Sequence, residues 1–205
     1  MSHENFRWII PNKLAASHTP TKKELEKYIS IGINTIICLQ TWEKSDIYGD
    51  FDKPRYCHKD VKDLKIDLFH IPVPDGLPPT DEQMDTFTRI VDNPKRIAVV
   101  HCHSGIGRTG CMLAVYMAHT YNLNSSEALR KLRDIWICYI QTPEQELAVR
   151  DYLNKKDKQK SKMTVCKECH HKMCKCGHCE GKHCTECNGC DVTDCKCLKF
   201  EEIFL

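Results

Sequence analysis

The sequence predicts an α/β fold in which a mainly parallel central sheet is flanked by helices. Helical segments alternate with short apolar strands up to residue 153, as in parallel sheets that helices cover on their faces. The strand at 97–100 is fully apolar and runs through His101 into a glycine-rich segment and then an apolar helix. Because a helix amino terminus attracts anions, the functional loop is expected at this strand-to-helix turn.

The helices are predicted from their amino-terminal signals. A threonine or asparagine followed three residues later by Glu or Gln has the spacing of a capping box. Pro143 fits the first turn of the last helix, where its missing N–H costs no hydrogen bond. Apolar runs predict the strands. The predicted helices are 21–31, 80–91, 111–121, one beginning at 124 and one from 142 to 153, and the predicted strands are 34–40, 66–71 and 97–100.

Bulk composition excludes several classes of protein. The 205 residues leave room for one ordinary domain and a small appendage. With 41% hydrophobic residues and a formal charge of +2, the chain resembles neither a disordered protein nor a dedicated nucleic-acid binder. No apolar run approaches the roughly 18 residues of a membrane span, and the amino terminus lacks a secretory signal. We expect the protein in the cytoplasm, with the nucleus as the alternative.

Cysteine usage divides the chain. Five of the fifteen cysteines are scattered before residue 150, and ten fall between Cys166 and Cys197. In a reducing compartment, closely spaced cysteines are metal ligands more often than disulfides. The predicted organisation is a globular domain over 1–153, a lysine-rich linker over 154–164 and a small metal-stabilised Cys/His-rich tail over 165–205.

Residues 101–110 read His-Cys-His-Ser-Gly-Ile-Gly-Arg-Thr-Gly and offer two of the three groups that hydrolysis of a phosphate ester needs. Cys102 is the candidate nucleophile, since a cysteine in an electropositive loop at a helix amino terminus becomes largely thiolate. Other cysteines lack this context. We expect Cys38, Cys111 and Cys138 to be packed thiols, because free cysteine is commonly buried.

The same segment has the features of a phosphate cradle. Gly105 and Gly107 let backbone N–H groups curl around one anion, and the dipole of the following helix favours negative charge there. Arg108 supplies a planar fork that binds two phosphate oxygens at once. Thr109 can donate its hydroxyl to the sulfur when the thiolate leaves in the second step. The predicted phosphate-binding residues are His103, Ser104, Gly105, Ile106, Gly107 and Arg108.

This segment matches the signature loop of the protein tyrosine phosphatase superfamily, and residues 5–153 as a whole resemble the compact atypical dual-specificity phosphatases. The resemblance implies a cysteinyl-phosphate intermediate that water hydrolyses, no cofactor in the chemistry, and phosphorylated proteins as substrates. It also implies that His101 orients the loop by hydrogen bonding and that an aspartate on a separate loop is the general acid.

Asp75 corresponds to this acid, in a Pro-Asp-Gly segment between a predicted strand and a capped helix. The alternative is an ordinary turn aspartate, because Pro-Asp-Gly is strong turn chemistry by itself. Gln141 and Gln145 lie where related enzymes position the attacking water, although Gln145 is also explained as a capping residue. The chain departs from its relatives at 134–139, where they often carry an Arg-Pro turn.

The Cys/His-rich tail is predicted to bind structural zinc. Repeated Cys-x2-Cys pairs suit tetrahedral zinc, and the tail has too few apolar residues to bury a core. A disordered or metallothionein-like cluster is the alternative, and the expected partner of the tail is a protein or a nucleic acid. The predicted ligands are Cys166, Cys169, Cys174, Cys176, Cys179, Cys184, Cys187, Cys190, Cys195 and Cys197, interleaved with His170, His171, His178 and His183.

Three functions are compatible with these features. The first is a protein phosphatase that hydrolyses phosphotyrosine and phosphoserine or phosphothreonine. The second is an RNA 5′-phosphatase or a phosphoinositide phosphatase of the same superfamily, although phosphoinositide enzymes usually carry lysines in the loop and RNA enzymes an asparagine in place of Gly107. The third is an inactive phosphate-binding adaptor with a recruiting tail, which would need a damaged catalytic set.

The zinc assignment has a direct test. Elemental analysis of the 205-residue chain should find two or three zinc ions, since ten cysteines and four histidines suffice for that number of four-ligand sites. A form ending at residue 153 should hold none. Chelation should unfold 165–197 without stopping hydrolysis of a small aryl phosphate, because the thiolate chemistry uses no metal. A zinc-free full chain would contradict the assignment.

Overall fold

The structure, a computed structural model, describes residues 6–43 and 52–163 of the chain. The chain forms two compact units, residues 1–154 and 155–205. The sheet and the candidate site belong to the first unit.

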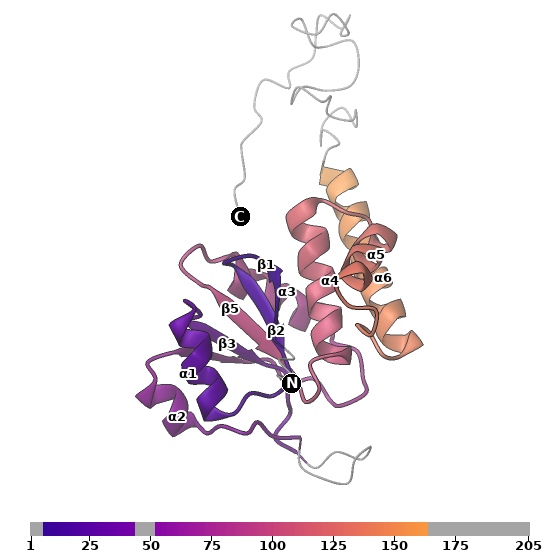
Figure 1. The fold of residues 1–205 in the computed structure, drawn as a ribbon. Helices are drawn as coiled ribbons and strands as arrows, with labels where there is room; N and C mark the ends of the chain where they lie inside the picture. Colours follow the sequence, from indigo (N-terminus) through magenta and orange to yellow (C-terminus); the bar gives the residue numbers. More distant parts are fainter. Residues whose placement is uncertain (1–5, 44–51, 164–205) are drawn as a thin grey trace, which may run out of the picture. The chain divides into compact units, whose positions relative to one another are not determined.

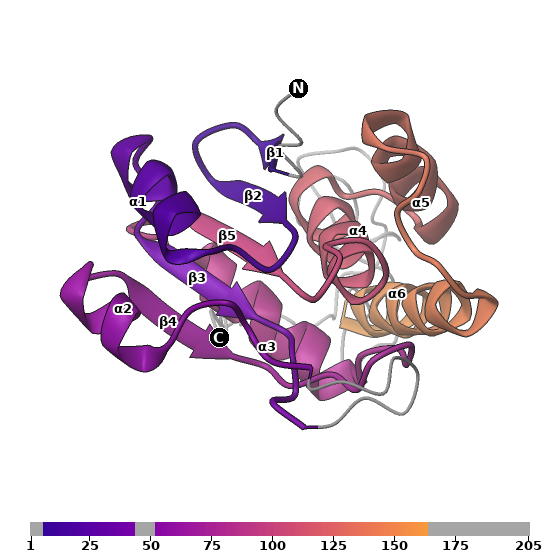
Figure 2. The same cartoon turned by 60° about the horizontal axis from the view of Figure 1, so that its bottom comes forward.

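The described residues contain a five-stranded sheet made of β1 (Arg7–Ile10), β2 (Leu14–Ser17), β3 (Thr35–Cys38), β4 (Asp67–His70) and β5 (Ala98–His101). The strand order is β1-β2-β5-β3-β4 (Figure 2). β1 runs antiparallel to β2, and all other neighbouring pairs are parallel. The carboxyl ends of β2 to β5 therefore meet at one edge, which is where ligands bind in open parallel sheets.

Helices cover both faces of this sheet, as the sequence predicts. Figures 1 and 2 show α1 and α2 on one face and the remaining helices on the other, in agreement with the two buried clusters of side chains. The helices are α1 (Lys22–Ser30), α2 (His58–Asp63), α3 (Asp81–Asp92), α4 (Gly107–Tyr121), α5 (Ser125–Ile135) and α6 (Pro143–Met163).

Successive residues of each strand pack against opposite layers. Ala15, Ile36 and Val99 belong to the cluster that α1 and α2 complete, whereas Ile37 and Val100 belong to the cluster under α3, α4, α5 and α6. Because both faces are covered, these strands read in the sequence as continuous apolar runs rather than as alternating ones.

Most of the predicted elements are confirmed. Thr21, Thr80 and Asn124 form complete capping boxes at the starts of α1, α3 and α5. The three predicted strands correspond to β3, β4 and β5. The sequence analysis did not find β1, β2 or α2, which have four, four and six residues.

The last helix is longer than predicted. The sequence analysis ended it near residue 153, but α6 continues to Met163 and takes in most of the expected linker. The reason is that residues 154–163 contain no glycine or proline, and lysine and glutamine are good helix formers. A shortened form is therefore better ended after Met163. α6 is long but polar, and no helix of the described part could cross a membrane.

Candidate active site

The signature segment begins at the end of a central strand. β5 lies between β2 and β3, and His101 pairs in register with Ser17 and Cys38. Cys102 follows directly and is 2% exposed. α4 begins at Gly107, and most of it is buried. The sheet and this buried helix thus fix both ends of the loop.

Close contacts explain both glycines of the loop. Gly105 has φ +74°, a conformation that side chains rarely adopt, and a Cβ there would lie 2.3 Å from Ser17 O. A Cβ on Gly107 would lie 2.7 Å from Gln141 Oε1 and 2.8 Å from Gln145 Oε1. The loop is therefore packed between the chain that leaves β2 and the residues around the start of α6.

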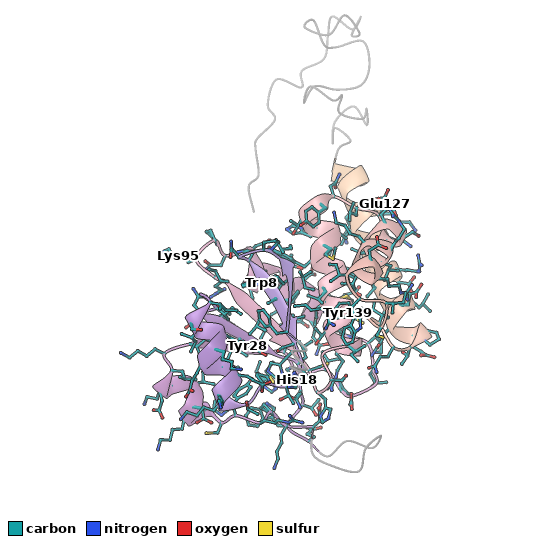
Figure 3. The ribbon with its side chains drawn as sticks, viewed as in Figure 1. Trp8, His18, Tyr28, Lys95, Glu127 and Tyr139 are labelled. Carbon is teal, nitrogen blue, oxygen red and sulfur yellow. The ribbon has the colours of Figure 1, made fainter. Side chains whose placement is uncertain are left out.

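Figure 3 labels one residue near each of these two neighbours. His18 comes just after β2, and Tyr139 lies beside α4. His18 Nε2 is 3.3 Å from Glu24 Oε1, which ties this segment to α1. Tyr139 is 2% exposed and packs against Gly110 in the first turn of α4, where a Cβ would lie 3.3 Å from the Tyr139 Cβ. Both neighbours of the loop are thus themselves anchored.

Arg108 is held by a carboxylate that the sequence analysis did not identify. Its exposed fraction is 2%. Nη1 donates to Asp52 Oδ2 at 2.5 Å and to Val73 O at 2.9 Å, and Nη2 donates to Asp52 Oδ1 at 3.2 Å. Asp75 Oδ1 forms a second ion pair with Nη2 at 2.8 Å. Two acidic side chains from separate segments therefore meet on one arginine.

Arg108 and Asp52 stabilise each other's charged form. Burial by itself lowers the pKa of Arg108 and raises that of Asp52. Hydrogen bonds and Coulomb attraction, first among them the hydrogen bond between the two side chains, outweigh burial, so that the pKa of Arg108 is raised and that of Asp52 is lowered. The stability that ionised Asp52 contributes is present above the pKa of an unfolded aspartate. It is lost as the pH falls through the depressed pKa of the folded state.

His101 is fully buried and neutral. Burial lowers its pKa to about 4. Nδ1 lies 3.2 Å from Cys102 O, and Nε2 lies 2.8 Å from the hydroxyl oxygen of Tyr56. Because a carbonyl oxygen only accepts, Nδ1 carries the proton and Nε2 accepts from Tyr56. These contacts support an orienting role for His101, whose single ring proton stays on Nδ1 near neutral pH.

Asp75 lies between β4 and α3, as expected from the sequence. Its Oδ1 accepts from Gly76 N at 3.0 Å, so it is a turn residue. The same oxygen forms the ion pair with Arg108, which brings the side chain to the predicted cradle. Oδ2 is buried and has no hydrogen-bond partner among the described residues. The turn and the site interpretations of Asp75 are therefore compatible.

Gln145 contacts the loop as well as its own helix. Gln145 N donates to Thr142 Oγ1 at 3.2 Å, which is half of a capping box. The side-chain Oε1 accepts from Gln141 N at 3.0 Å and lies beside Gly107. Gln141 and Gln145 are thus both next to the loop, as a role in positioning water would require.

The other predicted loop residues differ in exposure. His103 is exposed, and Ser104 and Ile106 are partly buried. Thr109 Oγ1 is buried and has no hydrogen-bond partner in the described part of the chain. Donation from Thr109 to the sulfur therefore stays a prediction.

One of the three cysteines expected to be packed is not. Cys38 and Cys111 are buried, and burial raises the pKa of Cys38 to about 11 and that of Cys111 still higher. Cys138 is exposed, so its prediction as a packed thiol is wrong. It lies in a turn after α5, where the chain runs over the surface.

The zinc assignment stays a prediction. Within residues 6–43 and 52–163, no group of three or more His, Cys, Asp or Glu side chains could hold a metal ion. The ten predicted cysteine ligands lie outside the described residues.

Asp52 and Tyr56 are the site residues that sequence reasoning missed. Both lie between β3 and α2, in a segment without a motif or a periodic pattern. Asp52 acts on a residue 56 positions away, and Tyr56 on one 45 positions away. No local signal could have found them.

Comparison with known proteins agrees with this geometry. The family described as PTP-SAK, Swiss Army Knife protein, DSP-PTPase phosphatase domain, matches residues 3–149. The chain belongs to this family of dual-specificity phosphatase domains. The matched residues of this chain include its five-stranded sheet and the signature loop at 101–110.

Curated relatives of this domain are larger proteins. The tyrosine-protein phosphatase cdc-14 of Caenorhabditis elegans is 32% identical over 143 residues, covering 63% of this chain and 18% of that protein. The dual specificity protein phosphatase CDC14B of Mus musculus is 29% identical over 131 residues, covering 63% of this chain and 27% of that protein. The chain thus spans less than a third of the length of these relatives.

Solved structures share the fold. The active form of Tk-PTP matches with a TM-score of 0.63 at 20% identity, covering 75% of this chain and 99% of that chain. PTPMT1 in complex with PI(5)P matches with a TM-score of 0.64 at 14% identity, covering 77% and 99% respectively. At these identities the likeness shows the architecture alone.

Substitution of Gly105 tests the packing of the loop. Gly105→Ala should lower phosphatase activity at least about tenfold, because the new Cβ would meet Ser17 O at 2.3 Å. Gly32→Ala is the matched control: its φ of +95° gives similar backbone strain, but the nearest atom to its Cβ is 3.9 Å away. The control should lower the melting temperature and leave kcat/KM unchanged. Equal losses of activity would contradict a specific role for the Gly105 contact.

Proposed function

We propose that this domain hydrolyses phosphotyrosine and phosphoserine or phosphothreonine in proteins through a cysteinyl-phosphate intermediate. The observation that carries the proposal is the ion pair of 2.8 Å between Asp75 and Arg108, at the start of the helix that follows Cys102. A nucleophile, an arginine fork and an acid from separate parts of the chain thereby belong to one site.

Each residue has one role in the proposed reaction. The thiolate of Cys102 attacks phosphorus, so that an S–P bond forms while the P–O bond to the leaving group breaks. Arg108 and the loop N–H groups hold the phosphoryl oxygens, and Asp75 gives its proton to the leaving oxygen. Water then attacks phosphorus, Asp75 takes one proton of that water, and the S–P bond breaks to return the thiolate. No step uses a metal ion.

The names of the relatives favour phosphoproteins as substrates. Both CDC14 relatives are called protein phosphatases, one for tyrosine and one of dual specificity. The loop has no lysine between Cys102 and Arg108 to hold the additional phosphates of an inositol ring. Phosphoinositides are the second candidate, because PTPMT1, whose structure holds PI(5)P, shares the fold.

An inactive adaptor fits the site less well. It would need only phosphate recognition, yet Cys102, Asp75 and the glutamines beside the loop are all present. In the proposed enzyme, the Cys/His-rich tail over 165–205 recruits a protein or a nucleic acid and holds structural zinc apart from the chemistry.

The assigned nucleophile can be tested with a substrate panel. The purified chain should hydrolyse phosphotyrosine and phosphothreonine peptides faster than phosphoinositides or 5′-triphosphate RNA. Cys102→Ser should abolish turnover while phosphopeptide binding remains measurable, because the cradle stays and only the thiolate is lost. Retention of a tenth of wild-type activity would exclude Cys102 as the nucleophile. A preference for lipid or RNA would replace the substrate proposal.

The role of Asp75 predicts a change in the pH–rate profile. Asp75→Asn should lower kcat by about 10²–10⁴ on phosphoserine peptides and less on aryl phosphates, whose leaving groups need less protonation. It should also remove the alkaline limb, which reports loss of the acid's proton. His101 cannot supply that limb, because its pKa of about 4 keeps it neutral. An unchanged alkaline limb would mean that another residue is the acid.

A further inference from the structure

Arg108 has two carboxylate partners that are held very differently. Both hydrogens of Nη1 are used, one by Asp52 Oδ2 and one by Val73 O, and Nη2 gives one hydrogen to Asp52 Oδ1. Asp75 adds an ion pair on Nη2 but no further hydrogen bond to the guanidinium. The donors left for a ligand, among contacts of the described residues, are therefore Nε and the second hydrogen of Nη2.

Asp52 is fixed in place by several partners. Its side chain is 2% exposed. Besides Arg108, Oδ1 accepts from Gln40 Nε2 at 3.2 Å, and Oδ2 accepts from Thr41 N at 3.1 Å and Thr41 Oγ1 at 3.5 Å. Removing this carboxylate would leave the buried charge of Arg108 with the more weakly held Asp75 as its carboxylate partner, which is unfavourable.

Asp75 is held far more weakly. Its side chain is 15% exposed, and within the described residues it accepts one hydrogen bond, the local one from Gly76 N. Its Oδ2 is without a hydrogen-bond partner within the described residues. Movement of this turn would therefore break one ion pair and no long-range hydrogen bond.

The free edge of Arg108 is the edge that a phosphate needs. An arginine binds phosphate best with two adjacent N–H groups in parallel, and Nε with Nη2 is such a pair. Asp75 Oδ1 lies at Nη2, which is one end of that edge, whereas Asp52 binds across Nη1 and Nη2. A phosphate can replace Asp75 without disturbing Asp52.

We propose that Asp52 is a positioning residue that fixes the fork of Arg108, and that substrate phosphate replaces Asp75, and only Asp75, on this arginine. The exchange releases the Asp75 carboxylate beside the phosphate, where it can take up a proton from water and give it to the leaving oxygen. In the unliganded enzyme, Asp75 holds the place of the phosphate. The inference rests on the proposed function, because it takes Arg108 as the phosphate clamp.

The two carboxylates should therefore have opposite effects on anion binding. The dissociation constant of inorganic phosphate is measured by titration calorimetry on the full chain and its variants. Asp75→Asn should bind phosphate about three- to tenfold more tightly, because a competing charge is removed. Asp52→Asn should bind it at least about tenfold more weakly, since the fork loses the charged hydrogen-bond partner that fixes it.

A matched variant controls for net charge. Asp63→Asn removes an exposed carboxylate of α2 that interacts with Lys22, and it should leave the phosphate affinity within twofold of wild type. In kinetics on a phosphopeptide, Asp52→Asn should raise KM and lower kcat, whereas Asp75→Asn should lower kcat without raising KM. A purely structural role of Asp52 would not produce this split.

Shifts in the same direction for Asp52→Asn and Asp75→Asn would overturn the exchange. If circular dichroism shows that Asp52→Asn does not fold, the phosphate affinity of Asp75→Asn tests the proposal by itself. Unchanged or weaker phosphate binding by Asp75→Asn would then overturn it. Because phosphate binding is measured without turnover, failure of the exchange can be distinguished from failure of the proposed function. Opposite shifts in phosphate affinity without hydrolysis of any phosphopeptide would support the exchange and refute the phosphatase assignment.

Discussion

The neutralisation of one buried charge organises the site. Arg108 is 2% exposed, and an ion in such a position costs several kcal/mol unless it is paired and hydrogen-bonded. Asp52 supplies two oxygens and Val73 a carbonyl, so that the chain before α2, the chain after β4 and the start of α4 must meet at this point. The fold thus places a cation where the sheet ends and keeps it charged.

The segment before α2 supports both ends of the signature loop. Asp52 binds Arg108 at the end of the loop, and Tyr56 binds His101 at its beginning. The first contact is ionic, and the second sets the tautomer of a buried neutral histidine. Between them the loop has little freedom, because Gly105 is packed against the chain leaving β2. Such restraint is what a preorganised phosphate cradle requires.

Further side chains of the site lie next to this rigid frame. Asp75 and the glutamines beside the loop come from turns and from the start of α6 rather than from the sheet. In the proposed reaction Asp75 acts first on the leaving group and then on water, which suits a carboxylate with fewer contacts than Asp52.

The sequence by itself determined the features that depend on neighbouring residues. Capping boxes, the strand that runs into Cys102, the glycine-rich turn and the place of Asp75 are local patterns, and each follows from backbone chemistry within a few positions. Only the tertiary structure decided which carboxylate pairs with Arg108 and which hydroxyl faces His101, because these contacts join residues 56 and 45 positions apart. It also decided that Cys138 is exposed, since burial depends on which surface the rest of the fold covers.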